Sequence, residues 1–352
     1  MEGSLPRPAR SRPLEPPTAP PARRRDDAKR LPLVLSLLAV LAITFVLTEN
    51  RRIERRSHFE EKTRRGNDDL GERRIPPVIW QTWRSRPDPA TSLGRQVRLL
   101  RARNPSHQYH FVDDKAQASF MRTNMTGAVA EAYFSINPDN GAARADLWRY
   151  CILWKYGGWY VDLDVGCRTP LQDLHKSEDE LAFAYERSSL PKEVPRSLEC
   201  VAPHSFDANI SQLLRARSFF RRRCIAQNIL GAAPGSPPLR AAIDRVVSSL
   251  REMKSAREAS CLREYTPTKR DLAKNHSWTW LRTIWLTGPF ALTVALREYV
   301  QREPSSSTLM GTFDAHATGC LSSKPVNAAM ASERPKYGSL VAERPFLVSS
   351  GD

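Results

Sequence analysis

The sequence predicts an α/β domain that follows a single N-terminal transmembrane helix. From about residue 75 onward, short β-prone runs alternate with amphipathic helical segments, a pattern typical of a sheet with helices packed on it. Before them, Leu31 to Thr48 form 18 residues without a charged side chain. As a helix this run would be roughly 27 Å long, close to the thickness of a thin bilayer core.

The organisation of the rest of the chain follows from composition. Residues 1–30 are rich in Pro, Arg, Ser and Ala and bury too little apolar surface to fold, which predicts a disordered cytosolic tail. Residues 31–48 lack both the polar face of a core helix and the Ala-x-Ala site that would follow a cleaved signal peptide, which favours a signal anchor. Residues 49–74 are charged and predict a solvated stem, and residues 75–352 form the lumenal domain.

The orientation of this anchor depends on the glycosylation sequons, because basic residues flank the run on both sides and the positive-inside rule does not decide it. Three sequons, at Asn124, Asn209 and Asn275, follow the anchor and favour a lumenal body. All six cysteines also follow the anchor, so an oxidising lumen would allow up to three disulfides, whose pairing the sequence leaves open. Cys151 is also consistent with a buried thiol.

The formal net charge of +16 raises the question of nucleic acid binding. The basic residues are dispersed among acidic ones, and no basic helix or zinc-finger spacing gathers them, so we expect no nucleic acid partner. A basic body fits an anionic substrate or a membrane surface equally well.

The elements of the body can be predicted in chain order. Residues 78–80 and 107–114 predict strands, and Pro89 to Asn104 predicts a helix between them. A longer helix is expected to begin near Pro138-Asp139-Asn140, to carry a core stripe, and to end at Gly157-Gly158. The stripe consists of Ala143, Leu147, Cys151 and Trp154. Further helices are predicted at residues 238–250 and after Gly288-Pro289.

Two carboxylates, Asp162 and Asp164, follow that helix in a run that otherwise looks like a buried strand. Residues i and i+2 of a strand point to the same face, so we expect the two acids to lie together, with Val161, Leu163 and Val165 on the other face. Two oxygen donors at this spacing suit Mn²⁺ or Mg²⁺, which would hold the oxygens of a diphosphate. A solvated strand end is the alternative interpretation.

The preceding helix carries Asp146 and Arg149, which are three residues apart and therefore on one face. They could form an ordinary ion pair on the helix surface. They could also bind a ligand beside Asp162, with Arg149 on a phosphate and Asp146 on a sugar hydroxyl.

Four blocks give the sequence a family resemblance: "IPPVIWQTW", "NPSHQYHFVDD", "ARADLWRYCILWKYGGWYVDLDV" and "TGPFALT". In this order they resemble the signature blocks of glycosyltransferase family 32, the Asp-x-Asp sugar transferases, which also resemble the glucosylating clostridial toxins. Together with "CIAQNILGAAPGSPPLRAAI", the block at residues 80–83 is most similar to the fungal-type initiating α-1,6-mannosyltransferases. Inositol-phosphoceramide mannosyltransferases are close relatives of these.

The resemblance implies a GT-A-type, Rossmann-like nucleotide-sugar transferase domain that uses a divalent metal and retains the anomeric configuration. Asp162, Asp164 and Arg149 would be catalytic, and Asp164 would be the direct metal ligand. Asp146, Arg149 and Asp162 would contact the donor, and Trp83 would stack on its base unless it is a core residue. The family's His…Gly-Ser-Trp segment is matched only by "DAHATGCLSS", which makes His316 a further candidate metal ligand, with a purely structural role as the alternative.

The resemblance further implies a Golgi membrane protein, single-pass and type II, with a lumenal catalytic domain that transfers mannose from GDP-mannose. UDP-galactose or UDP-N-acetylglucosamine remain alternative donors, and an N-glycan or a glycolipid such as inositol phosphoceramide is the expected acceptor. Complexes with other Golgi transferases are compatible with this location. Cys320 and Leu321 stand where the family has Ser and Trp. Either Ser322 or a backbone oxygen substitutes, or metal affinity is weaker, or the protein is an inactive relative that binds a glycan or a partner.

Overall fold

The computed structural model describes residues 73–189, 223–254, 282–322 and 346–348. The chain divides into units Met1–Glu60 and Glu61–Asp352, and every described residue belongs to the second unit. The predicted tail and anchor, nearly all of the stem, and the sequons at Asn209 and Asn275 therefore lie outside the described residues. Among the described helices, none has the length and apolar character needed to cross a membrane.

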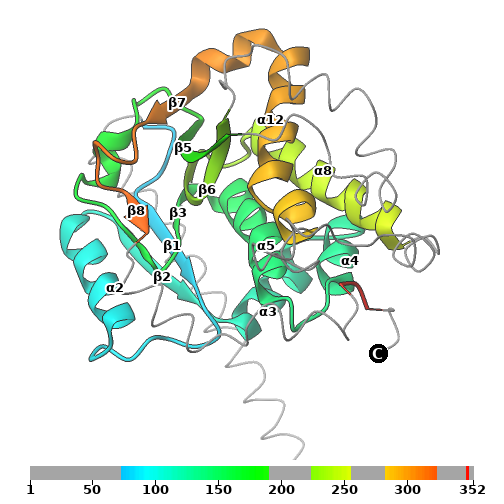
Figure 1. Cartoon of the computed structure of the whole chain (residues 1–352), viewed down its shortest axis with the longest axis horizontal. Coiled ribbons are helices and arrows are strands. Elements are labelled where there is room, and N and C mark those ends of the chain that lie inside the picture. Colours follow the sequence, from blue (N-terminus) through cyan, green and yellow to red (C-terminus); the bar gives the residue numbers. More distant parts are fainter. Residues whose placement is uncertain (1–72, 190–222, 255–281, 323–345, 349–352) are drawn as a thin grey trace, which may run out of the picture. The chain divides into compact units, whose positions relative to one another are not determined.

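The described domain is built on a six-stranded mixed sheet, with strand order β2-β1-β3-β6-β5-β7 (Figure 1). β1 runs parallel to both β2 and β3, whereas β6 is antiparallel to β3 and to β5. β7 closes the far edge parallel to β5. The strands are β1 (Val78–Thr82), β2 (Gln108–Val112), β3 (Gly158–Val161), β5 (Leu181–Ser189), β6 (Arg223–Ala232) and β7 (Met310–Phe313).

Helices cover this sheet, as the sequence predicts for an α/β domain. In Figure 1, α5, α8 and α12 lie together on one side of the sheet, and α2 lies on the other. Two short helices of residues 114–135, α3 and α4, were not predicted. The helices are α2 (Ser92–Arg103), α3 (Asp114–Asn124), α4 (Ala128–Ser135), α5 (Gly141–Tyr156), α8 (Pro237–Lys254) and α12 (Pro289–Arg302), with shorter turns η1 (Leu171–Leu174), η2 (Thr283–Thr287) and η3 (Pro304–Leu309).

The predicted boundaries of α5 are confirmed. Asn140 is its N-cap, and Gly157 ends it with φ of 68°, a conformation that glycine adopts without strain. The indole Nε1 of Trp80 donates a hydrogen bond to the Gly157 carbonyl oxygen at 2.9 Å and thereby ties β1 to the end of the helix. Strand β3 begins directly afterwards, so the helix and the strand that carry the candidate site residues are joined by two glycines.

The core divides between the two faces of the sheet. On the α2 face, Trp159 and Val161 of β3 pack in one cluster with Leu100 and with Cys167 and Cys320. On the other face, Tyr160 packs edge-on against Trp148 of α5, with ring centroids 6.3 Å apart. Successive residues of β3 therefore point to opposite faces, as they do in any strand.

A two-stranded ribbon lies on the α2 side of the sheet. It pairs β4 (Val165–Gly166) antiparallel with β8 (Leu321–Ser322). Beside the ribbon, a disulfide joins Cys167 to Cys320 across 153 residues of sequence, which settles one of the pairings that the sequence leaves open. Cys151 is a buried free thiol, as expected, and so is Cys224; Cys200 and Cys261 lie outside the described residues.

We predict that this disulfide contributes substantially to stability. Closing so long a loop restricts the unfolded chain, so replacing both cysteines with serine should lower the free energy of unfolding by about 3–5 kcal/mol. Chemical denaturation of the wild-type chain and of the Cys167→Ser, Cys320→Ser double variant would measure it. In the presence of a reductant the two proteins should become equally stable, whereas equal stability of the two oxidised proteins would contradict the prediction.

Candidate active site

The two acids of the Asp-x-Asp run do not share a strand face, which corrects one prediction. β3 ends at Val161, and the Val165 N–H donates to the Asp162 carbonyl oxygen at 3.0 Å, so residues 162–165 form a turn. Leu163, which was expected to pack with Val161 and Val165, instead packs with Leu93 in a separate cluster. The two side chains that lie together on one face are instead those of Tyr160 and Asp162. The strand ends sooner than predicted because the chain turns after Asp162: the Asp162 N–H still donates to the Asn228 carbonyl oxygen of β6 at 2.8 Å, and the Asp162 carbonyl oxygen then accepts from Val165.

Asp162 is held from two sides at the end of β3. The Tyr160 hydroxyl donates to Asp162 Oδ1 at 2.6 Å, and burial raises the pKa of Tyr160 well above its usual value, so the phenol remains a donor. The buried amide of Gln81 donates to the carbonyl oxygens of Val161 and Asp162 at 3.1 and 3.3 Å. The second carboxylate oxygen of Asp162, Oδ2, has no hydrogen-bond or ion-pair partner among the described residues.

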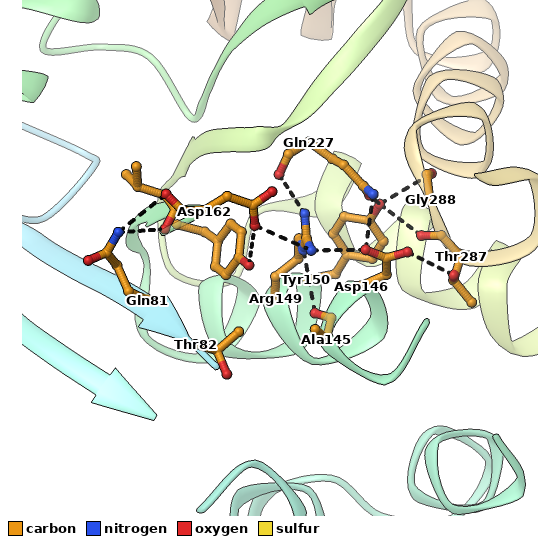
Figure 2. A network of polar contacts seen from close by, with 12 residues as sticks. Gln81, Thr82, Ala145, Asp146, Arg149, Tyr150, Asp162, Gln227, Thr287 and Gly288 are labelled. Carbon is orange, nitrogen blue, oxygen red and sulfur yellow. Dashed lines mark hydrogen bonds and ion pairs between the residues drawn. The ribbon is translucent and has the colours of Figure 1, made fainter. Parts of the chain in front are cut away.

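Arg149 reaches the same point from α5. Its side chain is only 6% exposed, and its Nη2 lies 2.9 Å from Asp146 Oδ1 and 3.7 Å from Asp162 Oδ1 (Figure 2). Its guanidinium carbon also stands 4.3 Å from the ring centroid of Tyr160. Nη1 donates to the Gln227 carbonyl oxygen at 2.9 Å. The structure thus brings Asp146, Arg149 and Asp162 together, and the pair that could have been a helix-surface ion pair is buried.

Asp146 is the most enclosed acid of this group, with a side chain only 3% exposed. Its Oδ1 accepts hydrogen bonds from Arg149 and from the Gln227 amide at 3.0 Å, and its Oδ2 accepts from the Thr287 hydroxyl at 2.9 Å. Burial raises the pKa of Asp146 to about 6, although Arg149 and both hydrogen bonds act to lower it. A carboxylate offers about four acceptor positions, so about one remains for a ligand.

Gln227, Thr287 and Tyr150 support this group and were not predicted individually. The Tyr150 hydroxyl donates to the Gln227 side-chain oxygen and also lies within hydrogen-bond distance, 3.0 Å, of the Thr287 carbonyl oxygen, so α5 contacts both β6 and η2 here (Figure 2). Each of the three residues lies inside a block that carries the family resemblance: "CIAQNILG", "TGPFALT" or the long central block. These blocks were the only indication in the sequence that the three residues matter, and the fold shows that the blocks meet around Asp146.

Asp146, Arg149, Asp162 and Gln227 line a cavity of about 510 Å³. Trp83, which comes just after β1, forms part of its wall and also packs against the cluster of Leu93 and Leu163. Trp83 is therefore anchored to the Asp-x-Asp turn and faces the cavity. The residues that line the cavity include Thr82, Trp83, Arg84, Asp114, Asn140, Asp146, Arg149, Tyr160, Asp162 and Gln227.

The predicted metal ligands are not assembled into one group. His316 is exposed in the loop after β7, does not line the cavity, and contacts Arg168 through its carbonyl oxygen at 3.4 Å. Across residues 73–189, 223–254, 282–322 and 346–348, no three His, Cys, Asp or Glu side chains gather around one point. Ser322 instead pairs with Val165, the residue after Asp164, so the C-terminal segment does reach the turn.

The candidate site lies within a segment of the chain that matches a known protein family. Residues 92–181 match the family model "Glycosyltransferase sugar-binding region containing DXD motif". That segment contains Asp146, Arg149, Asp162 and Asp164, and the resemblance read from the sequence is confirmed for it.

The relatives are fungal. A stretch of 108 residues is 37% identical to "Inositol phosphoceramide mannosyltransferase 2" of Schizosaccharomyces pombe and covers 31% of this chain and 30% of that protein. A stretch of 122 residues is 29% identical to "Initiation-specific alpha-1,6-mannosyltransferase" of Candida albicans, covering 33% and 31%. The match thus spans about a third of the length of each curated relative.

Among solved structures, "PaToxG Glycosyltransferase" matches at 12% identity with a TM-score of 0.39, over 84% of this chain and 98% of that one. At this TM-score the likeness supports no statement about function.

We predict that protonation of Asp146 lowers the activity of the protein at acid pH. The pKa of Asp146 in the native state, about 6, lies above its usual value, so the native state holds the proton more tightly than the unfolded chain. The contribution of Asp146 to the free energy of unfolding therefore falls as the pH rises toward 6. Activity should show the opposite trend, because protonation below about pH 6 removes the charge that orients Arg149.

A pH profile of kcat/KM checks this prediction. The wild type should show an acid limb with a midpoint near 6, and Asp146→Asn should have low activity without that limb. The exposed Asp244→Asn change on α8 is the control and should leave the profile as it is. A limb that persists in Asp146→Asn would show that another group titrates.

Proposed function

We propose that this chain is a membrane-anchored glycosyltransferase of GT-A type that transfers mannose from GDP-mannose to a glycan acceptor with retention of configuration. The observation that carries the proposal is the buried Asp146–Arg149–Asp162 group in the wall of a cavity, inside the segment that matches the Asp-x-Asp sugar-binding region. The mannosyltransferase names of the relatives support the choice of sugar.

The residues of the turn fit a divalent cation. Mg²⁺ and Mn²⁺ are commonly held by one or two carboxylates together with substrate phosphates, so two acids are enough and a third protein ligand is not needed. Asp162 keeps Oδ2 for this purpose, and Asp164 lies half-buried two residues on. A cation at Asp162 and Asp164 would neutralise charge on the donor diphosphate.

The protein's own groups account for donor positioning. Trp83 offers an aromatic face to the nucleobase at the cavity wall. Three acceptors, the Ala145 and Gln227 carbonyl oxygens and Asp146 Oδ1, take one N–H each from Arg149. A guanidinium has five N–H donors, so at least one remains for a phosphate or sugar oxygen.

In the proposed step, an acceptor hydroxyl attacks the anomeric carbon on the face from which the diphosphate leaves. The bond between that carbon and the phosphate oxygen breaks, a bond to the acceptor oxygen forms, and the acceptor proton passes to the departing phosphate. Arg149 stabilises the developing negative charge from a buried position fixed before the reaction, where such interactions commonly contribute several kcal/mol.

A glycolipid acceptor is the second candidate. It is favoured by the higher identity to the inositol phosphoceramide mannosyltransferase, 37%, than to the initiation-specific α-1,6-mannosyltransferase, 29%. Both acceptors are consistent with the Golgi location and the type II anchor predicted from the sequence. UDP-sugars remain the alternative donors for either acceptor.

An inactive relative is the alternative of a different class. The departure at Cys320 and Leu321 motivates it, but the Cys167–Cys320 disulfide and the pairing of Ser322 with Val165 keep the C-terminal segment beside the turn. Turnover therefore remains our proposal.

We predict that Asp164→Ala abolishes metal-dependent transfer and leaves the fold intact, because Asp164 lies half-buried in a turn rather than in the core. Release of nucleoside diphosphate with Mn²⁺ present measures transfer, and circular dichroism measures the fold. The exposed Asp173→Ala change is the control and should retain activity. Near-normal turnover by Asp164→Ala would exclude this acid as the metal ligand.

The donor is tested with the purified full chain and a panel of nucleotide sugars. We expect GDP-mannose to be hydrolysed faster than UDP-galactose or UDP-N-acetylglucosamine, and to be transferred when an N-glycan or inositol phosphoceramide is added. Preference for a UDP-sugar would overturn the choice of donor. Binding of GDP and Mn²⁺ with no turnover of any donor would favour the inactive relative.

A further inference from the structure

The outward face of α2 carries an unusual concentration of positive charge. Residues 89–112 contain no Asp or Glu, while arginines occur at positions 95, 98 and 101, and a fourth follows at position 103. Arg95, Arg98 and Arg101 are all exposed. Arg101 lies in the last turn of α2, where a cation is favourable, but Arg95 and Arg98 lie before it, and like charges on one helix face repel.

The same face carries exposed apolar side chains. Leu99 of α2 and Leu321 of β8 are 40% and 39% exposed, and they are the large hydrophobic residues that stand out as exposed in the described chain. Leu321 pairs with Gly166 of β4, and the Gln96 side chain of α2 packs directly over Gly166. In Figure 1, α2 and β8 accordingly lie side by side.

This surface is joined directly to the candidate active site. The inner face of α2 contributes Leu93 and Val97 to the cluster that contains Leu163 and Trp83. β4 begins one residue after Asp164, and Arg103 donates a hydrogen bond to the Cys167 carbonyl oxygen at 2.6 Å. One helix therefore supports the Asp-x-Asp turn with one side and exposes arginines and leucine on the other.

We propose that this surface, formed by Arg95, Arg98, Leu99, Arg101 and Leu321, docks the domain on an anionic lipid surface. A helix with a basic face and a few apolar side chains is the pattern that binds phosphate-bearing headgroups and inserts shallowly among them. Docking would hold the Asp-x-Asp turn close to the bilayer. The inference goes beyond the proposed function, since it requires no statement about donor or turnover.

The test uses photoreactive lipids and the full chain reconstituted in vesicles. Diazirine-bearing phosphatidylserine or phosphatidylcholine is activated, and labelled peptides are identified by mass spectrometry. We expect peptides of residues 92–103 and 320–322 to be labelled mainly by phosphatidylserine and less at high salt. Equal labelling of these peptides by both lipids, or by neither, would overturn the proposal and leave a protein partner as the occupant.

Two triple variants decide whether the arginines carry the binding. Each arginine near an anionic surface strengthens binding by about fivefold, so changing Arg95, Arg98 and Arg101 to Gln should weaken binding, and with it labelling, by roughly a hundredfold. The same change at Arg122, Arg251 and Arg302, which are exposed on α3, α8 and α12, removes equal charge and should leave it unchanged. An equal loss in both would show a general charge effect and overturn the proposal.

The variants also separate docking from folding and catalysis. The α2 variant should remain folded by circular dichroism, because the three arginines are exposed and make only surface contacts, Arg98 with the Pro89 carbonyl oxygen and Arg101 with the Tyr109 ring. Leu99→Ser should reduce labelling with all arginines present, and undiminished labelling would contradict the apolar part of the proposal. Labelling needs no nucleotide sugar, so a chain that docks without turning over any donor would count against the proposed function alone.

Discussion

The buried ion pair between Arg149 and Asp146 is the interaction on which the rest of the site depends. Taking both charges out of water is costly, and a partner left alone in this position would be destabilised strongly. The cost is offset because each group is also hydrogen-bonded to other elements: Arg149 to the Gln227 carbonyl of β6, and Asp146 to Gln227 and to Thr287 of η2. The pair therefore fixes α5, β6 and η2 relative to one another.

A second constraint acts from the other side of the sheet. The turn at residues 162–165 is fixed by Gln81 at its start, by Leu163 in the cluster under α2, and by the pairing of β4 with β8 at its end. The disulfide at Cys167 fastens this arrangement covalently. A turn held in this way is ordered before any ligand arrives, and pre-organisation of this kind would lower the cost of the cation and diphosphate binding that we propose for Asp162 and Asp164.

The departure from the family pattern at Cys320 has a structural explanation. Cys320 stands where the family resemblance leads us to expect serine, and it forms half of the disulfide beside the paired strands β4 and β8. Position 321 is then an exposed leucine next to α2 rather than an aromatic residue. The substituted pair thus contributes to the placement of the turn and to the proposed docking surface.

The sequence by itself determined the α/β class, the bounds of α5, the strands β1 and β2, and the candidate acids, because these depend on local periodicity, on capping residues and on short motifs. It did not determine the mixed order of the sheet, the place where β3 ends, or the pairing of the cysteines. Those depend on contacts between residues far apart in the chain, such as β6 inserted between β3 and β5. Only the tertiary structure showed that the Asp146–Arg149 pair is buried, because the groups that bury it come from β6 and η2, about 80 and 140 residues further along the chain.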